Sequence, residues 1–271
     1  MSRTGIVLLK KTRRRRARRI GVMFSCSHVN TWVPAGVVSP PRTGLVDETA
    51  RIRNLICFID HFDSFSFNVL AWLRQGSPGA RFLRVASDDL EFIQRLHSAR
   101  FPVVLSPGPG HPLEAHASMN LCRALMGRVP VLGICLGHQI IGAASGWEIA
   151  RSSRPFHGSR KKISLVGESY FWEGQHQFHA ATYNSLVLTP PIGSIDSIQS
   201  GDTGLKIVGT CDEGEIQAIE TSGPVKAAGV QFHPESFLSD DLSVFRDRWL
   251  QHAADWLATQ SSATAPLLIP S

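Results

Sequence analysis

A cysteine between two glycines is the first group in this sequence whose setting suggests chemistry. Residues 130–141 read PVLGICLGHQII, an apolar run that predicts a strand, followed by periodic residues that predict a helix. Gly133-x-Cys135-x-Gly137 matches the nucleophile-elbow pattern with Cys in place of Ser. We expect the glycines to permit a tight turn that exposes Cys135 at the helix N-terminus. There the helix dipole favours a nucleophilic thiolate, and the N–H of Leu136 could stabilise an oxyanion.

A histidine and a glutamate almost a hundred residues later could complete a catalytic group. Residues 229–236 read GVQFHPES, in which an apolar strand ends at His233. Pro234 stiffens the turn, and Glu235 can return to the side of His233 and orient its imidazole. Taken singly, residues 229–236 could be a surface turn, and Cys135 could be a buried structural cysteine. Together they supply a nucleophile, a base and an orienting carboxylate, which favours covalent catalysis.

A loop rich in glycine and proline, LSPGPGHP at 105–112, could supply further backbone donors. Ligands of open α/β sheets bind beyond the carboxyl ends of the strands, where we expect both this loop and the Cys135 elbow. Its glycines let backbone amides approach a ligand, so the loop is a candidate second oxyanion donor, with a rigid turn as the alternative. It lacks the Gly-Lys-Ser/Thr ending of a phosphate-binding loop.

Strands and helices alternate in the first part of the chain. Before the Cys135 elbow, the expected strands are 55–59, 81–85 and 101–105, and the expected helices are one capped by Asp63 or Ser64 that ends at Gly76 and one at 114–126. Such alternation requires crossover connections. It predicts an α/β fold with an open, mostly parallel sheet and helices on both faces.

Short strands separated by turns follow Gly146. They are expected at 162–165, 178–183, 186–188, 205–210 and 216–220. We expect them to extend the sheet and to add an antiparallel flap. A last helix at 242–257 should close the sheet, because its apolar residues share one face: Leu242, Phe245, Trp249, Ala253 and Trp256.

The basic character of the chain comes from its first residues. The net charge is +6, but residues 1–53 hold 12 Lys and Arg against 2 Asp and Glu, and the other 218 residues hold 16 against 20. A mildly acidic remainder gives no electrostatic footprint for nucleic acid. The arginine run at 10–19 has three readings: a nucleic-acid or nuclear-targeting tail, a transit peptide, or sequence upstream of a start at Met23. We favour a disordered extension at 1–53 without a catalytic role, a single domain at 54–260 and a flexible tail at 261–271.

The cysteines and histidines do not form the pattern of a metal site or a disulfide framework. The five cysteines, an odd and scattered set, are Cys26, Cys57, Cys122, Cys135 and Cys211. The set contains no C-x-x-C pair. His157, His176 and His179 lack metal-ligand spacing, so these histidines are expected to be surface or core residues. No apolar run reaches the ~18 residues of a membrane span. We therefore expect a cytoplasmic protein that uses no metal or organic cofactor and contacts no membrane.

The GICLGHQ elbow and the QFHPES segment together resemble the class I, triad-type glutamine amidotransferases, which release ammonia from the glutamine side chain. Three further stretches resemble one branch, the glutaminase subunits (component II) of anthranilate synthase and aminodeoxychorismate synthase. They are FIDHFDSF at 58–65, LSPGPGHP at 105–112 and YNSL at 183–186. The match runs in the same order from about Leu55 to about Ala258. It implies a flavodoxin-like domain that hydrolyses L-glutamine through a glutamyl thioester.

The resemblance also implies roles for individual residues. It makes Cys135, His233 and Glu235 the catalytic triad. It assigns the glutamine pocket to Gly108, Pro109, Gly110, Leu136, Gln139, Ser185 and Leu186. The alternatives are a helix-surface amide for Gln139 and a plain loop at 183–186. Thr182 and Asn184 depart from the family pattern, which usually has Arg and His at these positions.

Free ammonia is a poor product to make alone, so the resemblance implies a partner, a chorismate-binding synthase subunit (component I). Its product would be anthranilate or 4-amino-4-deoxychorismate. One alternative is the small subunit of carbamoyl-phosphate synthase, which shares the CLGHQ elbow but has a folded N-terminal domain, for which residues 1–53 are too short and too basic. The other is a non-catalytic binding module of the same fold, against which the intact Cys135, His233 and Glu235 argue.

Overall fold

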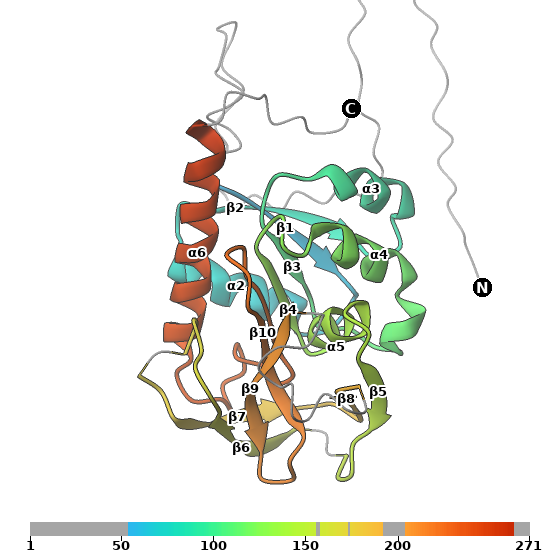
Figure 1. Ribbon diagram of the computed structural model, residues 1–271, viewed down its shortest axis with the longest axis vertical. Helices are drawn as coiled ribbons and strands as arrows, with labels where there is room; N and C mark the ends of the chain where they lie inside the picture. Colours follow the sequence, from blue (N-terminus) through green and yellow to red (C-terminus); the bar gives the residue numbers. More distant parts are fainter. Residues whose placement is uncertain (1–53, 156–157, 173, 192–203, 263–271) are drawn as a thin grey trace, which may run out of the picture.

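The structure is a computed structural model that describes residues 54–155, 158–172, 174–191 and 204–262 (Figure 1). The predicted extension at 1–53, most of the predicted tail at 261–271 and His157 lie outside these residues, so the predicted domain bounds stay predictions. Within the described ranges, no helix combines the length and the apolarity that crossing a lipid bilayer requires.

A nine-stranded sheet with the order β2-β1-β3-β4-β11-β10-β9-β6-β7 forms the centre of the molecule (Figure 1). Its first five strands are parallel: β2 (Arg81–Ala86), β1 (Leu55–Asp60), β3 (Val103–Leu105), β4 (Val131–Ile134) and β11 (Ala227–Val230). Antiparallel pairings add β10 (Ile216–Thr221), β9 (Leu205–Cys211), β6 (Ser159–Leu165) and β7 (Gln177–Thr182). A separate antiparallel ribbon joins β5 (Glu148–Arg151) to β8 (Leu186–Thr189). The predicted fold class and the antiparallel extension are confirmed.

Helices cover both faces of the parallel strands (Figure 1). On one face lie α2 (Ser66–Gly76) and α6 (Ser243–Ser262), with a core that includes Phe58 and Leu132 of the sheet. On the other face lie α3 (Leu90–Arg95), α4 (His116–Leu125) and α5 (Leu136–Ala144), with Leu105 and Val131 in their core. The predicted apolar face is buried: Leu242, which directly precedes α6, and Phe245, Trp249, Ala253 and Trp256 within it. Apolar burial of this kind is the main stabilising term of such a layered fold.

Several element ends differ from the sequence-based expectations. The N-cap of α2 is Phe65 rather than Asp63 or Ser64, although the Asp63 carboxylate accepts a hydrogen bond from the N–H of Phe65 at 2.7 Å. Strand β3 begins after Pro102, which has no N–H to donate to a sheet ladder. The 3₁₀ turn η2 (Pro112–Glu114) precedes α4, so this helix starts later than expected. Helix α3, which continues into the 3₁₀ turn η1 (Leu96–Ser98), was not predicted.

Candidate functional site

Cys135 lies at the bend between β4 and α5, where it forms the N-cap of the helix. Its φ of 51° and ψ of −101° lie in a region that side-chain-bearing residues rarely adopt. Such a conformation costs about 1–3 kcal/mol and persists only where the surroundings hold it. The N–H of Cys135 donates to Val230 O at 2.8 Å, and its carbonyl accepts from the N–H of Gln139 at 3.1 Å. These two backbone hydrogen bonds hold the bend at Cys135, whose side chain is half-buried.

The glycines on either side of Cys135 serve close packing rather than backbone freedom. Neither Gly133 nor Gly137 has a positive φ. A Cβ on Gly133 would lie 2.4 Å from the carbonyl carbon and oxygen of Gly137, and a Cβ on Gly137 would lie 2.2 Å from Leu105 O. The expectation that these glycines make the turn is therefore corrected. The turn is made by Cys135 itself, and the glycines let α5 approach β4 and β3.

His233 and Glu235 form a closely held pair just after β11. Nδ1 of His233 lies 2.7 Å from Oε1 of Glu235, and the two side chains are 2% and 0% exposed. The backbone N–H of His233 donates to Ala181 O at 2.9 Å, which ties this turn to β7. The imidazole also meets the rings of Phe65 and Tyr183 edge-on, with centroids 5.2 and 5.0 Å away. The ring of His233 is thus confined on several sides.

The charge state of His233 follows from its neighbours. Burial by itself lowers the pKa of the imidazole, but hydrogen bonds to the side chains of Cys135 and Glu235, and the negative charge that each can carry, raise it to about 10. The ring is therefore an imidazolium at neutral pH. A positive imidazolium beside a thiol favours the thiolate, so sulfur, ring and carboxylate act as one electrostatic unit.

The Pro-Gly-Pro-Gly loop lies against the elbow, as its expected place at the sheet edge required. A Cβ on Gly108 would lie 2.4 Å from His61 Cβ and 2.8 Å from Leu136 Cδ2. The Ser106 hydroxyl anchors the loop, because it accepts from the N–H of His61 at 2.8 Å and donates to Pro107 O at 2.6 Å. Pro109 has no N–H, so the backbone donors that this stretch offers are those of Gly108 and Gly110.

Gln139 is buried rather than a helix-surface amide, with 4% of the residue exposed. Its Nε2 donates to Leu186 O at 2.9 Å and to Oε1 of Gln231 at 3.0 Å, and Nε2 of Gln231 lies 3.7 Å from Cys135 Sγ. The structure therefore brings Cys135, Gln139 and Leu186 together, with exposed Ser185 adjoining them. Gln231 was missed by sequence reasoning. The available signal was its place two residues before His233, because alternate residues of a predicted strand share one face.

The two positions that depart from the family pattern have local hydrogen-bond partners. The hydroxyl of Thr182 lies 3.0 Å from that of Ser159. The Asn184 Nδ2 donates to Leu186 O at 3.0 Å, the same oxygen that Gln139 contacts. Asn184 thus supports the segment that the resemblance assigns to glutamine binding.

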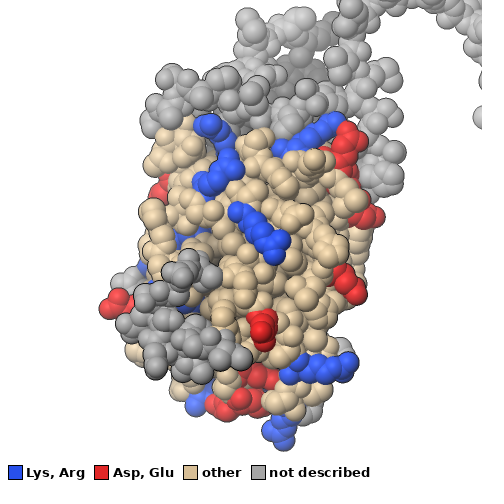
Figure 2. Space-filling model, turned by 45° about the vertical axis from the view of Figure 1, so that its right-hand side comes forward, with Lys and Arg blue, Asp and Glu red and all other residues tan. Residues whose placement is uncertain are grey.

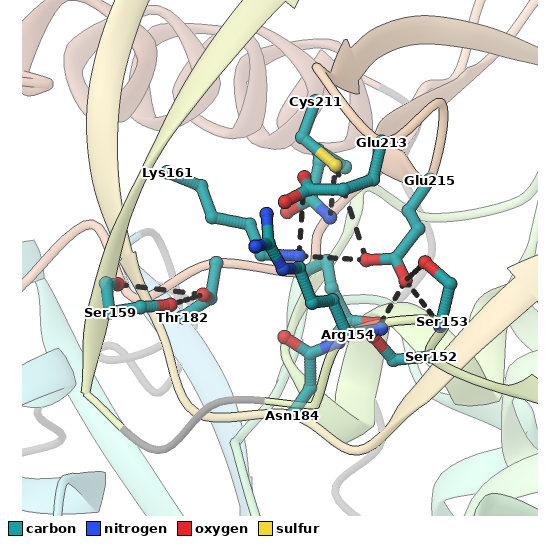
Figure 3. A network of polar contacts seen from close by, with 12 residues as sticks. Ser152, Ser153, Arg154, Ser159, Lys161, Thr182, Asn184, Cys211, Glu213 and Glu215 are labelled. Carbon is teal, nitrogen blue, oxygen red and sulfur yellow. Dashed lines mark hydrogen bonds and ion pairs between the residues drawn. The ribbon is translucent and has the colours of Figure 1, made fainter.

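A charged cluster lies beside Thr182 and Asn184 (Figure 3). Nζ of Lys161 is 2.8 Å from Glu215 Oε2 and 3.6 Å from Glu213 Oε2, and the Ser152 hydroxyl donates to Glu215 at 2.6 Å. Burial lowers the pKa of Lys161 and raises that of Glu215, but their mutual hydrogen bond and the other polar and charged neighbours together outweigh burial, so the net pKa of Lys161 is raised and that of Glu215 lowered. The pair therefore stays ionised across the physiological range.

The charged side chains elsewhere show no large patch of one sign on the face in Figure 2, where Lys, Arg, Asp and Glu are scattered over the part that the structure describes. Among the described residues, no three His, Cys, Asp or Glu side chains gather as a metal ion would require. Cys57, Cys122 and Cys211 are buried and free, and burial raises the pKa of each thiol. Cys135 is the one cysteine of the described chain that is not fully buried.

An open α/β sheet with cysteine at a strand-to-helix elbow and a His–Glu pair at the neighbouring strand end defines a class of enzyme. The family model described as "Glutamine amidotransferase class-I" matches residues 57–251. The chain belongs to this family and is a glutamine amidotransferase.

The similar proteins place it near one branch of the family. The anthranilate synthase component 2 of Cyanidium caldarium is 35% identical over 68% of this chain and 92% of its own length. The aminodeoxychorismate synthase component 2 of Klebsiella aerogenes is 32% identical over 69% and 94%. The bifunctional protein TrpGD of Thermotoga maritima is 33% identical over 76% of this chain. The match covers only 33% of that longer protein.

A solved structure shows the same fold at low sequence identity. It is a glutamine amidotransferase of Thermotoga maritima, with a TM-score of 0.56 and 18% identity, and the match covers 77% of this chain and 86% of that protein. The flavodoxin-like amidotransferase fold expected from the resemblance is confirmed.

Proposed function

We propose that this chain is the glutaminase component of a chorismate-using synthase and hydrolyses L-glutamine to glutamate and ammonia. The Cys135 thiolate attacks the side-chain amide carbon, and the N–H groups of Leu136 and of the Gly108–Gly110 loop stabilise the oxyanion. Protonated His233 gives its proton to the departing nitrogen, which leaves as ammonia. The glutamyl group then remains bound to Cys135 as a thioester.

The second half of the reaction uses the same groups. Neutral His233 takes a proton from water, which attacks the thioester carbon, and the Cys135 thiolate leaves as glutamate forms. Glu235 stabilises the imidazolium and holds its tautomer. The glutamine substrate is held by Gln139, by Ser185 and Leu186 on its amine and carboxylate side, and by the loop that contains Pro109.

The observation that carries this proposal is the environment of His233. Its imidazole lies 2.7 Å from the Glu235 carboxylate, and the side chains of Cys135 and Glu235 together raise its pKa to about 10. A histidine that only packs in the core would not need a cysteine at a strained elbow beside it. A nucleophile, a proton carrier and an orienting carboxylate at one point are the groups that amide hydrolysis, or a closely related acyl transfer, requires.

The partner is proposed from the relatives, which are named as component 2 of anthranilate synthase or of aminodeoxychorismate synthase. Glutamine and a chorismate-binding component I follow from those names, and they leave two products, anthranilate and 4-amino-4-deoxychorismate. The pathway would be that of tryptophan in the first case and of folate in the second.

Ammonia release from glutamine by the purified chain tests the proposal, alone and with a component I of each kind. We expect Cys135→Ser to lower kcat by at least about a thousandfold while the variant still binds glutamine. The complex with the correct partner should form aminated chorismate product from glutamine, and the Cys135→Ser complex should form it only from added ammonia. Unchanged glutaminase activity of Cys135→Ser would remove the sulfur from the mechanism.

A further inference from the structure

Gln231 is a fully buried amide in contact with the proposed nucleophile. It directly follows β11, and its backbone N–H donates to Gln217 O at 2.9 Å. Its Nε2 lies 3.7 Å from Cys135 Sγ, a hydrogen-bond distance for a sulfur acceptor. The mechanism proposed above gives this side chain no task.

The orientation of the Gln231 amide is fixed by its neighbours. The carbonyl oxygen of Leu186 can only accept a hydrogen bond, so the Gln139 amide must turn its Nε2 toward it. The second hydrogen of that Nε2 then faces Gln231, which must present Oε1 at 3.0 Å. Gln231 is left with its N–H groups toward the Cys135 sulfur. The amide therefore offers the sulfur a donor and not an acceptor.

We propose that Gln231 is a positioning residue that holds the Cys135 thiolate through this N–H donor, with Gln139 keeping the amide in the donating orientation. The inference rests on the proposed glutaminase function. A donor stabilises a charged sulfur more than a neutral one. Gln231 therefore favours the free thiolate before attack and as the leaving group of the thioester, and loses most of this interaction while the sulfur is acylated.

Alkylation of Cys135 by iodoacetamide tests the inference without glutamine turnover. The rate is followed by peptide mass spectrometry between pH 4 and pH 10, with Cys135→Ser as the blank. Gln231→Met keeps the length of the side chain and removes the donor. We expect alkylation of this variant to be about tenfold slower on the acid side of the profile and to equal the wild-type rate at high pH, because alkaline conditions favour the thiolate of any cysteine.

Gln217 provides a matched control on the neighbouring strand. It is also fully buried, and its Nε2 lies 3.8 Å from a cysteine sulfur, that of Cys211. Gln217→Met should leave the Cys135 profile unchanged. Gln231→Asn keeps an amide but shortens the side chain by one methylene, so it should show the same loss as Gln231→Met. It provides the test if Gln231→Met does not fold.

Steady-state kinetics add a second readout, in which Gln231→Met should lower kcat about tenfold with little change in KM. Alkylation profiles of Gln231→Met and Gln231→Asn equal to wild type, or an equal loss in Gln217→Met, would overturn the inference. Either result would leave the glutaminase proposal standing, since that proposal depends on ammonia release and on Cys135→Ser. Conversely, slower alkylation of the Gln231 variants, in a protein that releases no ammonia either alone or with a component I of each kind, would support the Gln231 contact and refute the glutaminase proposal.

Discussion

At the scale of single residues, the site depends on one imidazolium between two acids. Burial alone would make His233 neutral, and the ring stays charged because Cys135 and Glu235 both lie against it. Each partner can therefore be tested through the pKa of the ring as well as through activity. The aromatic rings of Phe65 and Tyr183 restrict its motion and do not supply charge.

Replacement of the carboxylate should damage catalysis more than binding. In Glu235→Gln the side chain keeps its shape but loses the charge that stabilises the imidazolium. We expect kcat to fall about 10²- to 10⁴-fold with KM nearly unchanged, and the pKa of His233 to fall. Initial rates of ammonia release and NMR titration of the ring measure the two effects. A variant with the wild-type kcat would show that the carboxylate has no part in turnover.

In the proposed mechanism, the raised pKa of His233 sets the alkaline limit of activity. Because the folded-state value of about 10 lies above the ordinary 6.5, the ring keeps its proton as the pH rises past neutrality and loses it near pH 10. The ammonia leaving group needs that proton, so kcat/KM should stay level through about pH 9 and fall with a midpoint near pH 10. In Glu235→Gln the midpoint should move to lower pH. A wild-type decline centred near pH 7 would contradict the assignment.

At the scale of elements, the elbow exists because α5 packs against the ends of β4 and β3 with no room for a side chain. The closest approach is at Gly137, where a Cβ would lie 2.2 Å from the carbonyl oxygen of Leu105. A backbone carbonyl in a buried sheet cannot move aside as a flexible side chain would. Stability and catalytic geometry are therefore coupled at this glycine.

Gly137→Ala should destabilise the fold by about 3 kcal/mol, because the added methyl overpacks the contact between α5 and β3. Urea denaturation measures the change in the free energy of unfolding. Gly79→Ala is the control, since Gly79 has no positive φ and a Cβ there would meet nothing within 4 Å. Its effect should stay within about 0.5 kcal/mol. Equal stability of the two variants would contradict the packing argument.

The cluster in Figure 3 joins β6 to the β9–β10 turn through buried charge. In Lys161→Met the Glu215 carboxylate loses its cation while its side chain remains 7% exposed. We expect a loss of about 3 kcal/mol, measured by thermal or urea unfolding. Arg95→Met breaks an ion pair with Glu91 whose side chains are 40% and 79% exposed, so it should cost under about 1 kcal/mol. Similar losses in both variants would argue against a buried-charge effect.

At the scale of the whole molecule, the site lies where the parallel and antiparallel parts of the sheet meet. Strand β4 leads to Cys135, β11 leads to His233, and β7 of the antiparallel part holds His233 through Ala181. β11 pairs with β4 on one side and with β10 on the other, so it belongs to both parts. The described residues thus contain every side chain that the mechanism uses.

Removal of residues 1–53 should therefore leave the proposed glutaminase activity intact. We expect kcat, KM and the melting temperature of the shortened chain to match those of the full chain. Its net charge should change from +6 to −4, since the removed residues hold 12 Lys and Arg against 2 Asp and Glu. Binding to a cation exchanger at pH 7 should be lost. A large loss of kcat would assign the extension a catalytic role that we do not expect.

Local patterns in the sequence were enough to predict several features of the fold and of the candidate site. The alternation of apolar runs predicted the parallel strands, the period of 3.6 residues predicted the buried face of α6, and the GICLGHQ and HPE segments marked the candidate nucleophile and base. These signals are readable because each depends on residues within one turn or one strand. The short helix α3 was not predicted, because six residues carry little periodicity. The cap of α2 was predicted wrongly, because several neighbouring residues could serve as its N-cap.

Tertiary structure alone decided how these pieces act together. The contact of Gln231 with Cys135 joins residues 96 positions apart. The backbone hydrogen bond from His233 to Ala181 links the turn after β11 to β7, and the order of strands along the chain does not reveal that these two segments lie together. The pKa of His233 depends on burial against two acids, and the function of Gly137 depends on a carbonyl of another strand. Only the folded sheet fixes these distances, because its register sets which residues of separate strands meet.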